Sequence, residues 1–278
     1  MNKKNKFASV LTAIITVVLL AITVYPLFWM LTASFKEPSE FVTKPAYALN
    51  SGFYVQNYID AWTRGNMSTF FKNSLINTLI SLVFIVFFSV TLGFALTKME
   101  WKYRKFVRGL IGIGIMVPIT TALLPLFQIY NTIGLYNTRS SLVISYVAFG
   151  LSLSTYLTIA FFKSLPNELL EAAVIDGCGI SKLMTMVVVP LMKNAIVTVL
   201  VLQFFFKWND LLFSMTFISS TELKTIMTGL LYFQDEFGSK NWGAIFASIS
   251  LSVFPLLIVY LFLNKAVIEG MTSGAIKG

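Results

Sequence analysis

Long stretches without any charged residue constrain this chain more than any other feature of its sequence. Five of them lie between successive charged positions: Lys6 and Lys36, Lys72 and Lys98, Arg108 and Arg139, Arg139 and Lys163, and Lys240 and Lys265. A further apolar segment, residues 195–219, is interrupted by Lys207 and Asp210. Because about 20 apolar residues cross the hydrocarbon core of a bilayer as a helix, the sequence predicts six membrane spans.

The spans predict an all-α, polytopic membrane protein, since a lipid-exposed backbone must satisfy its own hydrogen bonds. Only 12% of the residues are charged and 56% are hydrophobic, whereas about a quarter of a soluble domain is charged. We expect a single transmembrane domain over residues 1–278. The expected spans are residues 8–33, 73–97, 109–130, 140–162, 195–219 and 242–264, with a polar loop at 164–190.

Lysine and arginine in the connecting segments predict the orientation, because cytoplasmic loops are enriched in both. The set of ends that includes both termini and residues 98–108 carries roughly twice as many of them as the other set. We therefore expect both termini and the 164–190 loop to be cytoplasmic. The first apolar run is too long for a cleaved signal peptide and lacks a clear small-x-small site, so we expect a retained anchor.

The residue inventory argues against catalysis by this chain. It has no histidine and one cysteine, Cys178, which excludes an internal disulfide and leaves a zinc site without its usual ligands. There is no phosphate-binding Gly-x-x-x-x-Gly-Lys loop. We expect no cofactor bound by the chain itself. The net charge of +9 is explained by topology and does not indicate a nucleic-acid partner.

The 164–190 loop is the most informative polar segment. Pro166 suits the start of a helix, and Glu168 and Glu171 follow early, where negative charge favours the positive end of the helix dipole. Ala172 and Ala173 are helix formers with little bulk. The pattern predicts a short helix that could fit closely into a groove on a partner.

Glycines predict how this helix ends. Asp176-Gly177 is typical of a helix C-terminus, because glycine readily adopts the left-handed conformation. Gly179 is a second permissive point, and Ser181 is a candidate N-cap for the next helix. We expect the apolar side chains to face the lipid-side core and the carboxylates to face a partner; the apolar set is Leu165, Leu169, Leu170 and Val174. An ordinary solvated amphipathic helix is the alternative interpretation.

The spacing Glu-Ala-Ala-x-x-Asp-Gly-x-Gly, from Glu171 to Gly179 and followed by Pro190, resembles the cytoplasmic loop of bacterial ABC importer permeases. Three more segments carry the resemblance: residues 25–36, the Phe206–Asp210 stretch Phe-Lys-Trp-Asn-Asp, and the tail 270–278, Gly-Met-Thr-Ser-Gly-Ala-Ile-Lys-Gly. Together they are similar to carbohydrate permeases of the maltose-system G type. The tail favours this sugar branch over amino-acid or polyamine permeases.

The resemblance implies a permease in the bacterial cytoplasmic membrane that pairs with a second homologous permease. Two ATPase subunits, which use ATP and magnesium, and an extracytoplasmic sugar-binding protein would complete the importer of a sugar or oligosaccharide. The residues implied for ATPase coupling are Glu168, Glu171, Ala172, Ala173, Asp176, Gly177, Gly179 and Pro190. Those implied for a tail at the ATPase interface are Gly270, Gly274, Lys277 and Gly278.

Polar and aromatic side chains within the third to fifth spans are candidates for the substrate pathway, because burying polar groups in a membrane is costly. They are Gln128, Asn131, Tyr156, Gln203, Trp208 and Asn209. Each could equally be structural, by joining helices or anchoring at the interface. Lys207 and Asp210 could form a self-neutralising pair. Pro118, Pro125 and Pro255 could kink the spans or be tolerated without a kink.

Two other classes of transporter remain as alternatives. One is an ABC permease for another small solute, such as a polyamine or an amino acid. The other is an ion-coupled secondary transporter, which usually carries acidic or histidine residues within its spans. Asp210 is the one acidic residue within the expected spans, which disfavours that second alternative.

Overall fold

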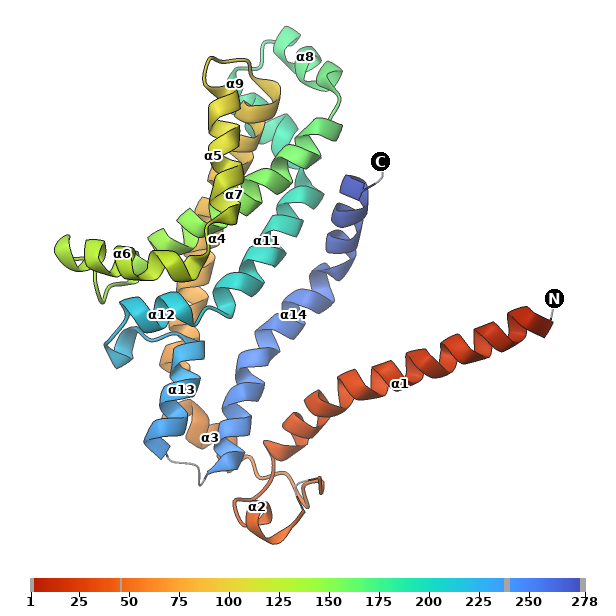
Figure 1. The fold of residues 1–278 in the computed structure, drawn as a ribbon, viewed down its shortest axis with the longest axis vertical. Coiled ribbons are helices and arrows are strands. Elements are labelled where there is room, and N and C mark those ends of the chain that lie inside the picture. Colours follow the sequence, from red (N-terminus) through yellow and green to blue (C-terminus); the bar gives the residue numbers. More distant parts are fainter. Residues whose placement is uncertain (1–2, 46, 238–240, 276–278) are drawn as a thin grey trace. The chain divides into compact units, whose positions relative to one another are not determined.

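The computed structural model describes residues 3–45, 47–237 and 241–275 and is all-α over these ranges, as the sequence predicts (Figure 1). The elements are α1 (Lys3–Ala33), α2 (Glu40–Thr43), α3 (Gln56–Thr63), α4 (Met67–Lys98), α5 (Arg104–Met116), α6 (Ile119–Thr132), α7 (Arg139–Ser164), α8 (Asn167–Ile175), α9 (Ile180–Lys182), the π-helix η1 (Leu183–Val188), α10 (Val189–Leu191), α11 (Lys193–Trp208), α12 (Leu212–Phe217), the 3-10 helix η2 (Thr221–Leu223), α13 (Ile226–Phe237) and α14 (Trp242–Ala275).

Four helical stretches within the described residues are long and apolar enough to cross a membrane unbroken: Ser9–Ala33, Met67–Lys98, Arg139–Ser164 and Trp242–Leu263. Two further spans exist only as bent pairs. One pair, α5 with α6, is bent by 101°, and the other, Ile180–Leu191 with α11, is bent by 77°. The described residues therefore contain four candidate spans, or up to six if each bent pair counts as one span.

The expected third span, residues 109–130, is divided at Val117 and Pro118. Val117 has an extended backbone (ψ 115°), and Pro118 precedes the first residue of α6. A residue before proline is disfavoured in the helical region, because the proline ring clashes with it. Pro125 and Pro255, by contrast, lie inside α6 and α14, which continue through them.

The expected fifth span, residues 195–219, is not one helix either. The helix α11 ends at Trp208 and α12 begins at Leu212. Asp210 lies in the break, and its carboxylate oxygens accept hydrogen bonds from the backbone N–H groups of Phe213 (3.2 Å) and Ser214 (3.1 Å). By capping α12 in this way, Asp210 favours the start of a new helix over the continuation of α11.

The described chain divides into two compact units, of which the larger comprises residues 69–229 and 255–278. Within it α7 packs against α5 and α11, and α12 packs against α6 and α7. Small residues allow close approach: a Cβ atom added at Gly114 would lie 2.2 Å from the Oγ of Ser152, and one at Gly93 would lie 2.4 Å from the Oγ1 of Thr158. Because glycine has no side chain, the helix backbones can approach each other closely at these contacts.

The smaller unit comprises residues 1–68 and 230–254. Its connection from α1 to α3 is fastened by the buried Asn57, whose Nδ2 donates to the carbonyls of Ser34 (2.9 Å) and Lys36 (2.7 Å). Gly243 on α14 leaves room for this amide, since a Cβ there would lie 2.3 Å from its Nδ2. Specific hydrogen bonds therefore order this irregular segment.

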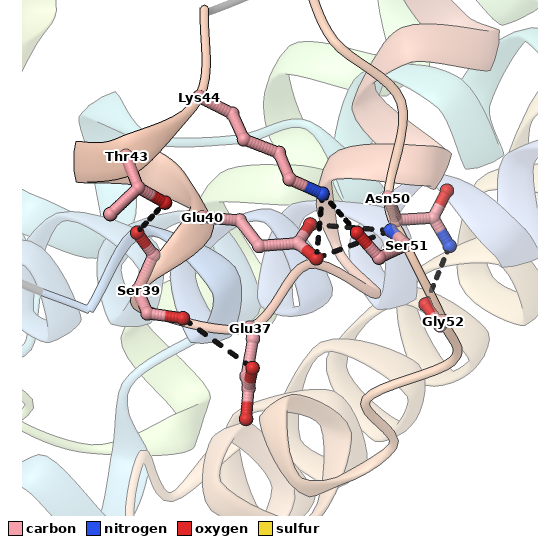
Figure 2. A network of polar contacts seen from close by, with 8 residues as sticks. All are labelled: Glu37, Ser39, Glu40, Thr43, Lys44, Asn50, Ser51 and Gly52. Carbon is pink, nitrogen blue, oxygen red and sulfur yellow. Dashed lines mark hydrogen bonds and ion pairs between the residues drawn. The ribbon is translucent and has the colours of Figure 1, made fainter.

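Figure 2 shows the polar network around α2 in the same segment. Glu40 Oε1 accepts hydrogen bonds from Lys44 Nζ (3.2 Å) and from the backbone N–H of Ser51 (3.2 Å), and Lys44 also donates to the Ser51 hydroxyl. Hydrogen bonding from the Ser51 side chain, together with Lys44, holds the pKa of Glu40 below its usual value, although burial acts in the opposite direction. The network joins α2 to the chain eleven residues further on.

Candidate functional site

A lysine at the end of α4 fixes the entry into the 164–190 loop. The helix α7 ends at Ser164, and Leu165 and Pro166 are extended before α8 begins at Asn167. Lys98 Nζ donates to the Leu165 carbonyl (2.6 Å) and to Asn167 Oδ1 (2.6 Å). The Lys98 ammonium thus donates hydrogen bonds both to the end of α7 and to the first side chain of α8, and so fixes the start of the loop.

The end of α8 is a Schellman motif. Gly177 has a φ of 81°, its N–H donates to the Val174 carbonyl (3.0 Å), and the N–H of Cys178 donates to the Ala173 carbonyl (3.0 Å). Only glycine adopts this backbone conformation without strain. The sequence prediction that Asp176-Gly177 ends the helix is therefore confirmed.

The segment after the turn differs from expectation. Gly179, with an extended backbone (ψ 162°), precedes the first residue of α9, so the expectation of Ser181 as the N-cap is wrong; Ser181 lies inside α9. The π-helix η1 then leads into Pro190 in α10. A proline ring clashes with the carbonyl four residues earlier, and a wider π turn relieves that clash.

One side chain of α8 anchors it to the helix bundle. Leu170 is 7% exposed and packs in a core cluster with Phe94, Phe162, Leu183 and Val188, among others. Leu165 also packs against this cluster, whereas Leu169 and Val174 are outside it and are 47% and 57% exposed, so their expected place on the lipid side stays a prediction. An interface to a partner would cover such exposed apolar groups.

The polar coupling candidates lie on the open side of the loop. Glu168, Glu171, Ala172, Asp176, Gly177, Gly179 and Pro190 are all exposed, and Ala173 is half-buried against the core. A Cβ added at Gly177 or Gly179 would meet no atom within 4 Å. The loop therefore has a fixed backbone and side chains free to meet a partner. Figure 1 shows α8 at one end of the larger unit, near the turn from α4 to α5.

The candidate tail is only partly within the described residues. Gly270 and Gly274 lie in α14. Lys277 and Gly278 lie outside the described residues, so their expected place at an ATPase interface stays a prediction.

A cavity of about 330 Å³ opens in the larger unit beside the break between α5 and α6. Its walls come from α5, the break, α6, α7 and the region around the end of α11. The lining residues are Gly114, Ile115, Val117, Ile119, Tyr146, Phe149, Leu153, Gln203, Phe206, Lys207, Asp210 and Phe213. The lining is mainly apolar with a few polar groups, which is the usual character of a small-ligand pocket.

On the polar side of this cavity, Asp210 forms hydrogen bonds that fix the neighbouring groups in place. Besides capping α12, its Oδ2 accepts a hydrogen bond from the Tyr146 hydroxyl (2.8 Å), and Tyr146 is itself buried. The Lys207 Nζ lies 5.5 Å from the centre of the Tyr146 ring. The sequence offered Lys207 and Asp210 as a pair and Tyr146 as one of several polar groups in the spans, but it did not place Tyr146 beside the pair, because nothing in the sequence brings α7 beside the end of α11.

Of the six pathway candidates, Gln203 lines the cavity. Gln128, Asn131 and Tyr156 are exposed on α6 and α7. Trp208 is buried, with its ring 5.5 Å from that of Phe204 and 5.3 Å from that of Phe71. Asn209 is exposed, and its Nδ2 donates to the Phe205 carbonyl (2.9 Å) at the end of α11. The structure thus brings one candidate to the cavity and gives Trp208 and Asn209 packing and capping contacts.

An all-helical chain with several spans, a mainly apolar cavity with a few polar groups among its helices, and an exposed helix-and-turn is typical of the membrane component of a transporter. Comparison with known families identifies which one. Residues 85–273 match the family described as "Binding-protein-dependent transport system inner membrane component". The chain therefore belongs to this family. It is a permease subunit of an ABC importer, a non-catalytic, multi-pass protein of the inner membrane that functions with a binding protein, an ATPase and permease partners.

Relatives along the whole chain agree with this assignment. The chain is 33% identical over 254 residues to the probable ABC transporter permease YurM of Bacillus subtilis, covering 91% of this chain and 84% of that one. It is 31% identical over 272 residues to the trehalose/maltose transport permease MalG of Thermococcus litoralis, covering 95% and 96%. A bacterial ABC transporter involved in the import of alginate has the same fold, with a TM-score of 0.84 at 19% identity over 95% of this chain and 98% of that one.

Proposed function

We propose that this permease subunit serves the uptake of a sugar or oligosaccharide and forms half of its translocation pathway. A second homologous permease forms the other half, two ATPase subunits drive the cycle, and an extracytoplasmic binding protein delivers the sugar. Both termini and the 164–190 loop face the cytoplasm. The chain itself holds no cofactor, because ATP and magnesium belong to the ATPase subunits.

One observation carries the coupling role: α8 combines a fixed backbone with an exposed surface. Lys98 holds its start, Leu170 anchors its underside and the Gly177 turn fixes its end. No other described residue covers Glu171 or the exposed apolar side chains of α8. A short rigid helix of this kind can transmit a rigid-body movement of the ATPase to the spans, whereas a flexible loop would absorb it.

Two lines of support favour sugars over other small solutes. The tail over residues 270–278 resembles that of carbohydrate permeases, and a relative similar along nearly the whole chain is named for trehalose and maltose transport. A polyamine or amino-acid permease is the alternative. An ion-coupled secondary transporter is disfavoured because Asp210, the acidic residue beside the cavity, has its oxygens occupied by Tyr146 and two backbone N–H groups.

A charge-reversed loop tests the coupling role. We expect Glu171→Lys combined with Gly177→Asp to leave the protein inserted but to lower sugar-dependent ATP hydrolysis and uptake by roughly 30-fold, the effect of losing about 2 kcal/mol at an interface hot spot. The matched control is Glu222→Lys, which reverses an exposed charge outside the loop. Normal uptake by the double variant would refute the coupling assignment.

Purification of the tagged chain from its native membrane tests the assembly. We expect a second multi-span permease and an ATPase with a phosphate-binding loop to co-purify in mild detergent, as mass spectrometry would show. A chain that purifies alone and still transports without ATP would instead support a secondary transporter. Thiol labelling of single cysteines placed at residues 2 and 171 in intact cells would test the cytoplasmic orientation.

A further inference from the structure

Lys207 places a cationic side chain in the wall of the cavity. It is 7% exposed, lies in the last turn of α11 and contributes to the lining. Its ammonium group lies against the face of Tyr146, 5.5 Å from the ring centre. A ring face attracts a cation but offers no lone pair that could replace water as a hydrogen-bond acceptor.

The neighbouring carboxylate of Asp210 does not supply a hydrogen-bond acceptor for the Lys207 ammonium. Asp210 accepts three hydrogen bonds: two backbone N–H groups of α12 and the Tyr146 hydroxyl. The ion pairs closer than 4.0 Å in the described part of the chain are Lys44–Glu40 and Arg64–Asp60, so Lys207 and Asp210 do not form a contact pair. Asp210 attracts the ammonium at a distance, while three N–H donors of Lys207 stay without an acceptor among the described residues.

A buried ammonium without an acceptor is costly, and the cost is greatest where water is scarce. An oxygen acceptor that enters the cavity would remove much of this cost, because hydrogen bonds to a charged donor are stronger than those between neutral groups. The Lys207 ammonium therefore favours a ligand that carries oxygen atoms over a ligand that is purely apolar.

The rest of the lining suits one residue of a saccharide. The volume of about 330 Å³ lies at the lower end of the range for small-ligand pockets. Phe149, Phe206 and Phe213 provide aromatic walls for the apolar C–H faces of a sugar ring. Gln203 also lines the cavity, and its Nε2 donates to the Gly150 carbonyl and the Ser154 hydroxyl, which fixes this side chain against α7.

We propose that Lys207 contacts the substrate and determines specificity, by donating from its ammonium to an oxygen of the saccharide held in this cavity. The inference rests on the proposed function and adds the residue and the recognised chemistry. The acceptor is either a sugar hydroxyl or a carboxylate of an acidic sugar, and the two are distinguished below. Asp210 and Tyr146 hold the donor in place and do not themselves need to contact the substrate.

Direct sugar binding by the complex without its binding protein tests this. The full permease–ATPase complex would be analysed by native mass spectrometry with two sets of probes, neutral gluco-, galacto- and xylo-oligosaccharides and acidic oligogalacturonates. The variants are Lys207→Met, which keeps the length of the side chain and removes the charge, and Lys207→Arg, which keeps the charge. Lys163→Met, at an exposed lysine of α7, is the matched control.

We expect the wild-type complex to retain a saccharide and Lys207→Met to retain it about tenfold less, with Lys207→Arg and Lys163→Met near the wild type. A loss confined to the oligogalacturonates would show that the ammonium recognises a carboxylate, and a loss that includes neutral sugars would show recognition of hydroxyls. Equal retention by Lys207→Met, or none by the wild type, would overturn the proposal. In that case a complex that co-purifies intact and hydrolyses ATP would leave the proposed function standing.

Discussion

The loop around α8 and the cavity beside the α5–α6 break show opposite uses of the same helical scaffold. In the loop, the backbone is fastened by Lys98, Leu170 and Gly177, and the polar side chains are left outside. Beside the cavity the backbone is broken twice, between α5 and α6 and between α11 and α12, and buried side chains contact one another around an open space. A surface that meets a protein partner needs a rigid frame, whereas a site for a small ligand needs fixed side chains.

The largest effect should come from the centre of the cavity network. We expect Asp210→Ala to lower the free energy of unfolding by about 3 kcal/mol, because it removes the cap of α12 and leaves the buried Tyr146 hydroxyl without this acceptor. Thermal melting of the purified complex would measure this. Asp210→Asn keeps an oxygen for the cap and should lose about half as much. If the two variants are equally stable, the carboxylate does not organise the cavity.

A smaller effect is expected where the loop is fastened. Lys98→Met leaves the Leu165 carbonyl and the Asn167 side chain without their donor. Since water can partly replace it, we expect α8 to be destabilised by about 1–2 kcal/mol, with faster hydrogen exchange over residues 167–178 and little change in the cavity. Lys163→Met serves as the control. Unchanged exchange in the Lys98 variant would mean that Leu170 alone positions the helix.

The smallest effect separates two neighbouring glycines. Gly177→Ala should cost about 1 kcal/mol, because alanine is strained at a φ of 81°, whereas nearby atoms leave room for its methyl group. Gly179→Ala should be neutral, since that residue has an ordinary extended backbone and open space around it. Hydrogen exchange in α8 would measure both. Equal effects would show that the loop requires small residues rather than a left-handed turn.

The sequence was sufficient for features that depend on local chemistry. Charge-free runs predicted the four unbroken apolar helices, because a bilayer excludes charge over a fixed thickness. Asp176-Gly177 predicted the end of α8, because the left-handed conformation is a property of glycine itself. Pro118 was noted as a possible kink, but its preceding residue could have indicated the complete break. Ser181 was misassigned because Gly179 begins the next helix without a side-chain cap.

The candidate cavity could not be predicted in the same way, because its members are brought together only by packing between helices. Gln203, Lys207 and Asp210 belong to one stretch of sequence, but Tyr146 and Phe149 come from α7 and Gly114 from α5. Trp208 was a candidate for the substrate pathway because of its residue type, but in the structure its ring packs against those of Phe71 and Phe204. Leu169 and Val174 are likewise exposed because the core packs against the face of α8 that carries Leu170.

The sequence by itself determined an all-helical membrane chain, the loop with its turn, and the resemblance that gives its family. These follow from hydropathy, charge and backbone preference, which act on residues close together in the chain. The tertiary structure alone decided which side chain anchors α8 and which polar groups enclose the cavity. Those outcomes depend on which distant side chains come within contact distance, and local preferences do not specify that.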